Sequence, residues 1–175
     1  GIATPRPIAF FHRARDPIGA ESWYICEDFA PSSSAREAFN AFSRGAGEHL
    51  GVKAGEFYDR SALFIKQMHD RGVYFRDLSA GNLLFRTGGG ELEFAVIDTA
   101  RAVFHHRPAG LRERLCDLMR VCHPLSREGR LKLVARYMAL TGRRYRVWMA
   151  LPFAYYNAKH KIKGRLRFLR GRARR

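Results

Sequence analysis

The chain has 175 residues, of which 46% are apolar and 13% aromatic, and it carries a formal charge of +16 at pH 7. This length and composition predict one globular domain with a real core and exclude a wholly disordered chain. An odd number of cysteines, three, argues against a secreted disulfide framework, and the sequence contains neither a signal-peptide pattern nor an apolar run of about 18–20 residues, so we expect a soluble or peripheral protein of a reducing cytoplasm.

The first thirty residues predict a β-hairpin. Residues 8–11 form a short apolar run, and residues 16–19 supply turn chemistry. The second strand is expected over residues 22–29, which are rich in aromatic and β-branched side chains and stop at Pro31.

Two helices are expected next, separated by a glycine-rich loop. Ser34 and Glu37 have the spacing of a capping box, which predicts a short helix that ends near Phe42. Apolar residues then recur at helical spacing between residues 56 and 71, and Gly72 is a good helix stop. The second helix should therefore bury one face in the core.

The strongest functional signal lies around a second hairpin. Residues 83–86 and 91–97 predict two strands, with Asn82 and Asp98 at their outer ends. Because antiparallel strands bring their outer ends together, we expect Asn82 and Asp98 side by side, near the loop that carries Asp77. Phosphoryl transfer from ATP uses these groups: Asp77 would accept the proton of the attacking hydroxyl, and the other two would hold magnesium.

The remainder of the chain is predicted to be helical. Apolar residues at helical spacing predict one helix around residues 111–122 and another around 131–138, which ends at Gly142.

Two motifs carry a resemblance to known proteins: Phe75-Arg76-Asp77 stands where kinases have His-Arg-Asp, and residues 96–101 resemble the Ile-Asp-x-x-Arg metal motif of sugar kinases. Over most of residues 5–170, and most strongly over 66–103, the chain resembles the protein-kinase-like superfamily, and within it the lipopolysaccharide core kinases that phosphorylate Kdo or heptose sugars. The resemblance implies an α+β fold with a mostly helical C-lobe, a catalytic-loop β-hairpin, and the last strands of an incomplete N-lobe. The implied parts are the end of the small lobe and hinge (1–30), the C-lobe (31–152), and a basic helix and tail (153–175).

The same resemblance implies roles for individual residues. Asp77 and Arg76 would be catalytic, and the backbones of Glu27 and Phe29 would contact adenine. Cys26 would be the gatekeeper, and Leu84 would lie beneath the purine. Asp117 would either be the carboxylate that in kinases braces the catalytic loop from the following helix, or lie on the exposed surface. An ordinary strand or core role is an equally good reading for each nucleotide-site residue taken singly.

The expected function is an ATP- and Mg-dependent kinase that transfers the γ-phosphoryl group to a sugar hydroxyl of a lipopolysaccharide core. Its substrate would be a lipid-linked sugar at the cytoplasmic face of the inner membrane of a Gram-negative-type bacterium. No Gly-rich loop or strand lysine precedes residue 5, so we expect the sequence to be a fragment of a longer kinase. The alternatives are another kinase-fold phosphotransferase, acting on a small molecule or a protein, and a non-catalytic kinase-like scaffold.

The positive charge is concentrated at the C-terminus. Residues 129–175 contain 15 Lys and Arg and no acidic residue, whereas residues 1–128 contain 17 basic and 16 acidic residues. An apolar stripe at helical spacing predicts a basic amphipathic helix, which we expect to bind an anionic membrane surface through residues 155–175. Packing of the stripe on the domain is the alternative. Nucleic-acid binding is not expected, because the sequence has no nucleic-acid-binding motif.

Overall fold

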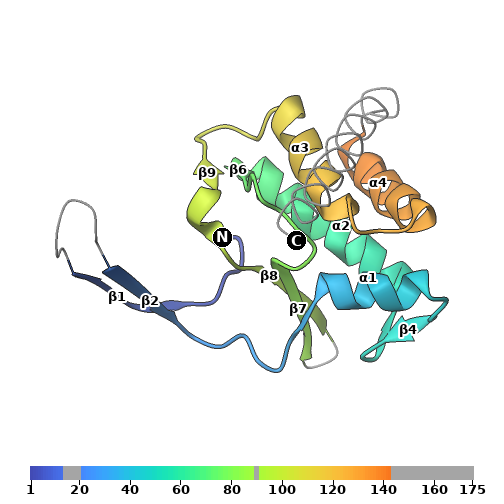
Figure 1. Cartoon of the computed structure of the whole chain (residues 1–175). Helices are drawn as coiled ribbons and strands as arrows, with labels where there is room; N and C mark the ends of the chain where they lie inside the picture. The colour runs from blue at the N-terminus through green and yellow to red at the C-terminus, as the bar shows by residue number, and fades with distance from the viewer. Residues whose placement is uncertain (14–20, 89–90, 143–175) are drawn as a thin grey trace, which may run out of the picture.

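The computed structural model describes residues 1–13, 21–88 and 91–142 (Figure 1). The expected turn at 16–19, the distal part of the expected C-lobe and the basic segment 153–175 lie outside the described residues. Four helices make up most of the body: α1 (Ala35–Ser43), α2 (Ala54–Asp70), α3 (Leu111–Cys122) and α4 (Arg127–Thr141). Helix α2 packs along α4, and α3 and α1 contact the same pair.

The strands of the described residues form four small antiparallel sheets. They are β1–β2 (Pro7–Arg13, Glu21–Cys26), β3–β7–β8 (Ser33–Ser34, Leu83–Gly88, Glu91–Val96), β4–β5 (Glu48–His49, Val52–Lys53) and β6–β9 (Val73–Tyr74, Val103–Phe104). A 3-10 turn, η1 (Thr99–Arg101), lies between β8 and β9. The result is a mixed α and β architecture in which helices dominate the body.

The core lies between α1, α2 and the β7–β8 hairpin. Phe57, on the buried face of α2, is 0% exposed, and its ring makes edge-on contacts with four others, among them one from α1 and one from each strand of the hairpin. The ring centroids lie 5.3 Å from Phe39 of α1, 4.9 Å from Phe85 of β7 and 5.3 Å from Phe94 of β8. Such edge-to-face aromatic packing is favourable beyond simple burial, so the hairpin is fixed firmly to α2.

Alternation along β7 decides which side chains enter that core. Leu83 and Phe85 are buried, whereas Leu84 between them faces the opposite side and is only partly covered. Leu83 pairs with Val96, and the ladder continues one step further because the Ile97 N–H donates to the Asn82 carbonyl at 3.0 Å. The outer ends of the hairpin are therefore adjacent, as expected from the sequence.

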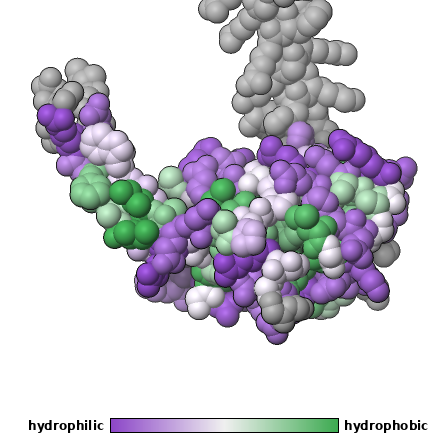
Figure 2. Space-filling model, turned by 90° about the horizontal axis from the view of Figure 1, so that it is seen from below, coloured by the Kyte–Doolittle hydropathy of each residue, from purple (hydrophilic) through white to green (hydrophobic). Residues whose placement is uncertain are grey.

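The β1–β2 hairpin stands away from the body as an arm (Figures 1 and 2). Each large apolar side chain on it is between 46% and 65% exposed; these are Ile8, Phe10, Phe11, Trp23, Tyr24 and Ile25. The register places Phe10 opposite Tyr24 and Phe11 opposite Trp23. Since neighbouring residues of a strand face opposite sides, both faces of the arm are apolar.

The structure corrects two details of the sequence analysis around α1. Ser34 occupies the N-cap of α1, but its side chain makes no capping hydrogen bond, and the Ser33 hydroxyl bonds the Glu37 carboxylate instead. Ser34 also pairs with Leu84 of β7, so strand pairing rather than a capping box sets the start of the helix.

The glycine-rich loop after α1 also has more structure than expected. It folds into the β4–β5 hairpin, whose two turn residues, Leu50 and Gly51, both have positive φ (48° and 78°). Two left-handed residues in succession match the right-handed twist of the flanking strands. Helix α2 consequently begins at Ala54, slightly before the predicted start.

Candidate active site

The loop that carries Asp77 is held from beneath by Asp117 of α3. The Asp117 carboxylate is completely buried and accepts the backbone N–H groups of Phe75 at 2.8 Å and Arg76 at 2.9 Å. Phe75 fills a core position at 1% exposure. Of the two roles considered for Asp117, the structure supports the brace, because charge-assisted hydrogen bonds to backbone N–H groups fix a loop strongly.

The chain then turns sharply to present Asp77. Arg76 has a φ of +66° and an exposed side chain, a strained conformation of the kind that collects at functional sites. Asp77 is 33% exposed, and both of its side-chain oxygens are paired. Oδ1 lies 3.0 Å from Nη1 of Arg120, and Oδ2 lies 3.1 Å from Nη1 of Arg101.

Asn82 and Asp98 lie together beside this loop. The Asn82 side chain donates from Nδ2 to the main-chain carbonyl of Asp77 at 3.1 Å. This hydrogen bond does not use the Oδ1 atom of Asn82, which can act as a ligand. Asp98 is exposed, and its backbone adopts the left-handed conformation, with a φ of +61°. A carboxylate and an amide oxygen at the two ends of one hairpin are the hard oxygen ligands that Mg²⁺ prefers.

This donor set fits a metal that is shared with a ligand. Within the described residues, no group of three or more His, Cys, Asp or Glu side chains could hold a metal ion. Mg²⁺ typically takes one or two carboxylates and completes its shell with water and substrate phosphates. Asn82 and Asp98 therefore suit a magnesium ion that arrives with a nucleotide.

The residues expected at the nucleotide lie in two places. Phe29 is in contact with the outer face of β7, where the Arg86 guanidinium lies 4.3 Å from the centre of its ring. Leu84 is on that same face, two residues before Arg86. Cys26 ends β2, and the Glu27 N–H bonds the Arg6 carbonyl at the base of the arm.

A buried polar network connects α2, α3 and α4 under the site. His69 contacts the Tyr137 hydroxyl with Nδ1 at 2.7 Å and the Asp117 carboxylate with Nε2 at 3.4 Å. Arg114 donates to the same hydroxyl at 3.0 Å and pairs with Asp70 at 2.7 Å. A neutral imidazole with its proton on Nε2 satisfies every one of these contacts. Burial accordingly lowers the pKa of His69, although the neighbouring Asp117 acts in the opposite direction.

The end of α2 is joined closely to the segment that follows the metal motif. Gly72 has a φ of +80°, and a Cβ added there would lie 2.2 Å from the carbonyl oxygen of His105. The His105 N–H bonds the Gly72 carbonyl at 2.9 Å, and the Ala109 N–H bonds the His69 carbonyl at 2.7 Å. Only glycine permits this close approach.

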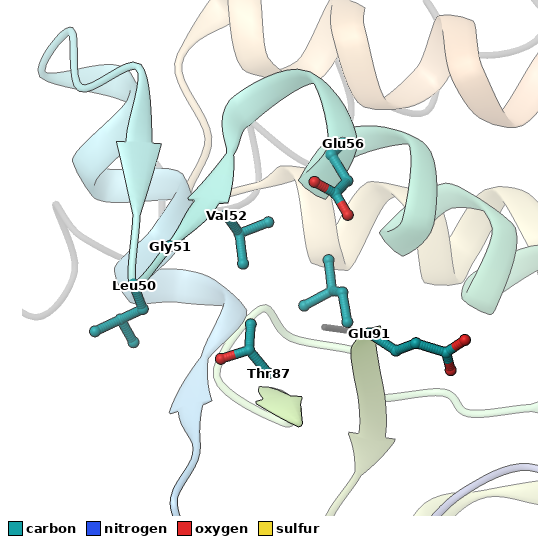
Figure 3. Close-up of a pocket in the computed structure, with 7 residues that line it drawn as sticks. Leu50, Gly51, Val52, Glu56, Thr87 and Glu91 are labelled. Carbon is teal, nitrogen blue, oxygen red and sulfur yellow. The ribbon is translucent and has the colours of Figure 1, made fainter. Parts of the chain in front are cut away.

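A cavity of about 340 Å³ lies at the opposite end of the β7–β8 hairpin from Asn82 and Asp98 (Figure 3). It is lined by Leu50, Gly51, Val52, Glu56, Thr87, Glu91 and Leu92. Because Thr87 and Glu91 border the hairpin turn, this cavity is separate from the site around Asp77.

Comparison with known proteins agrees with this geometry. The model of the lipopolysaccharide kinase (Kdo/WaaP) family matches residues 1–137. The chain belongs to this family. Membership makes it a phosphotransferase that acts on sugar hydroxyls, and more specifically a lipopolysaccharide core kinase.

A solved structure with the same fold is described as WaaP in complex with acyl carrier protein. It has 21% sequence identity and a TM-score of 0.63, and the match covers 93% of this chain and 69% of that one. The protein-kinase-like fold class expected from the sequence is thereby confirmed. No curated protein sequence matches the chain.

Sequence reasoning missed two parts of the site. The two arginines paired with Asp77 were not singled out, although Arg101 is the last residue of the quoted Ile-Asp-x-x-Arg motif. The connection of His69 to Tyr137 left no sequence signal, because the two residues are distant in the chain and meet only when α2 packs on α4.

Proposed function

We propose that this kinase uses ATP and magnesium to phosphorylate a hydroxyl of a Kdo or heptose residue in a lipid-linked lipopolysaccharide core. The observation that carries the proposal is the convergence of Asp77, Asn82 and Asp98 at the outer end of one hairpin. These groups match the needs of phosphoryl transfer, in which positioning and charge neutralisation do most of the work.

Asp77 would orient the acceptor hydroxyl and take its proton. The hydroxyl oxygen forms a bond to the γ-phosphorus, the bond from that phosphorus to the bridging oxygen of ADP breaks, and ADP leaves with the electron pair. Asn82 and Asp98 would hold magnesium, which would neutralise charge on the phosphate oxygens. Asp117 contributes by keeping the Asp77 loop in place through the backbone of Phe75 and Arg76.

The adenine would bind between the hinge and the outer face of β7. Leu84 supplies an apolar, partly exposed surface there. The Phe29 ring contacts the guanidinium of Arg86, which belongs to the same strand. In this arrangement Cys26, Glu27 and Phe29 would line the edge of the purine. The Glu27 N–H is already bonded to Arg6, which leaves the Glu27 carbonyl as the acceptor.

The substrate is lipid-linked, so we further propose that the enzyme works at the cytoplasmic face of the inner membrane. Within the described residues, no helix is long and apolar enough to cross a bilayer. The excess of Lys and Arg over residues 129–175 supports attraction to anionic lipid head groups. It would equally suit an acidic protein partner, and the related WaaP structure contains acyl carrier protein.

The test is ATP-dependent phosphorylation of a lipid A–core acceptor by the full-length protein. Asp77→Asn should lower kcat by about 10²- to 10⁴-fold, the range expected for loss of a general base. Asp98→Asn should lower activity comparably and raise the magnesium concentration required for half-maximal rate. Glu56→Gln, an exposed acid on α2, is the matched control and should retain the wild-type rate. Wild-type activity in the Asp77 and Asp98 variants would overturn the proposal.

A further inference from the structure

Asp77 is paired with more positive charge than the binding of a neutral hydroxyl group would require. Each oxygen of this carboxylate is paired with a different guanidinium, one from Arg101 at the end of η1 and one from Arg120 near the end of α3. An incoming hydroxyl must therefore share an oxygen with an arginine or displace one. Within this cluster two guanidinium groups face one carboxylate, so one positive charge remains without a matching negative charge in the cluster.

Further positive charge surrounds the same loop. The Arg36 guanidinium of α1 lies against Gly81, where an added Cβ would be only 2.8 Å from its Nη2. The Arg76 side chain is exposed next to Asp77. The other two carboxylates near this loop have other roles: Asp117 is buried and accepts backbone N–H groups, and Asp98 is proposed to hold magnesium.

The two arginines also belong to the acceptor side of the site. The metal-ligand pair, Asn82 and Asp98, lies at the end of β7–β8, and Asn82 contacts the main chain of Asp77. Arg120 instead reaches the side chain of Asp77 from α3, which packs on β6. Its side chain is 33% exposed and that of Arg101 is 61% exposed, so both can turn toward a bound molecule.

We propose that Arg120, together with Arg101, binds an acid group of the acceptor, a carboxylate or a phosphate, next to the hydroxyl that is phosphorylated. The Asp77 carboxylate now pairs with both guanidinium groups, and the acid group of the acceptor would replace it in one of these pairs. When the acceptor binds, a guanidinium moves to the acid group, because planar guanidinium pairs well with carboxylate and phosphate. An oxygen of Asp77 then becomes free to accept the hydroxyl. This inference rests on the proposed function and makes Arg120 a residue that selects anionic acceptors.

The experiment compares matched acceptors with the full-length protein. One pair is an alkyl glycoside of a sugar acid and its primary carboxamide, and a second pair is a sugar phosphate and the same sugar without phosphate. The wild type should favour the anionic member of at least one pair by about 10- to 100-fold in kcat/KM, the range for a charged hydrogen bond. Which pair responds identifies the acid group.

The variants assign that preference to Arg120. Arg120→Gln should reduce the anionic preference at least about fivefold while leaving the KM for ATP unchanged, and Arg120→Lys should restore part of it. Arg112→Gln, which changes an exposed arginine on the same helix, should leave the preference intact. Thermal melting of each variant verifies folding, since loss of one partly exposed arginine should change stability little.

Three results would overturn the inference. The first is that the wild type uses both members of each pair equally well. The second is that Arg120→Gln keeps the wild-type preference. The third is that a higher KM for ATP accounts for the whole effect of Arg120→Gln, which would assign the arginines to the nucleotide. Calorimetric titration of the sugar acid and its carboxamide measures the preference without turnover. If Arg120→Gln bound the sugar acid as tightly as the wild type does, the inference would also be contradicted. Failure of the proposed function is distinguishable, because Asp77→Asn would then retain activity whatever the acceptor preference.

Discussion

Two antiparallel hairpins of this chain have opposite relations to the core. In β7–β8, Leu83 and Phe85 point inward and are at most 1% exposed. In β1–β2, every large apolar side chain is at least 46% exposed, and the hairpin extends away from the body (Figure 1). Both consist of two paired strands, but only the first is fixed by packing on the core.

The difference agrees with the location of the candidate active site. A two-stranded hairpin alone is marginally stable in water, so the precise placement of side chains needs a hairpin that is buried on one face. Asn82 and Asp98 are at the ends of the buried hairpin, whereas Cys26 and Glu27 are at the base of the exposed one. We therefore expect mutations to have large effects at β7–β8 and its supports, and small effects in the arm.

The largest expected effect is from Phe85→Ala in the buried hairpin. Removing this ring leaves a cavity against Phe57 and Phe94 and should lower the free energy of unfolding by about 3–5 kcal/mol. Urea unfolding followed by circular dichroism measures it. A loss below about 1 kcal/mol would show that the hairpin is not fixed by this packing.

Asp117→Asn should have the next largest effect, about 2–3 kcal/mol. The amide cannot accept both the Phe75 and Arg76 N–H groups as a carboxylate does, and a buried donor without a partner is costly. Kinase activity should fall as well, because the Asp77 loop loses its brace. Asp59→Asn, which disrupts an exposed ion pair with Arg136, should change stability by less than about 0.5 kcal/mol. Equal effects in the two variants would contradict the role of Asp117.

The pH dependence of stability should reflect His69. Its pKa is lowered in the folded state by burial, so the unfolded chain binds the extra proton first as the pH falls below about 6.5. Stability is therefore complete above that pH and decreases below it, by at most about 1.4 kcal/mol per pH unit for one proton. His69→Gln should remove this slope between pH 5 and 6.5. The losses at lower pH from carboxylates with a lowered pKa, which include Asp70, Glu113 and Glu128, should remain.

The smallest expected effect is in the arm. Phe10→Ala and Phe11→Ala remove rings that are 65% and 55% exposed, and each should change the free energy of unfolding by less than about 0.5 kcal/mol. The same urea titration as for Phe85→Ala provides the comparison. A loss above about 2 kcal/mol would mean that the arm is covered in solution.

The sequence predicted the elements and contacts that depend on local pattern. The hairpin over residues 83–97 and the neighbouring ends of its strands follow from apolar runs around a glycine turn, and antiparallel pairing then brings Asn82 and Asp98 together. Helices α2 and α3 follow from apolar periodicity. The motif at Asp77 predicted the family, which the family match confirms.

Contacts that depend on how helices rotate and pack could not be predicted. Arg120 reaches Asp77 across 43 residues, and His69 reaches Tyr137 across 68. Their positions follow only after α3 and α4 have docked on α2. The exposure of the arm was also missed, because aromatic residues on both faces predict a strand equally well whether or not anything covers them.

The close approach of Gly72 to His105 has a consequence for control of the enzyme. Residues 99–102 are all that separate Asp98 from β9, and β9 is bonded to β6 directly after Gly72. Kinases that are switched on by phosphorylation need a long segment after the metal-binding Asp that can change between two positions. Here that stretch is short and its continuation is bonded to the end of α2, so we expect the position of Asp98 not to depend on phosphorylation of this segment.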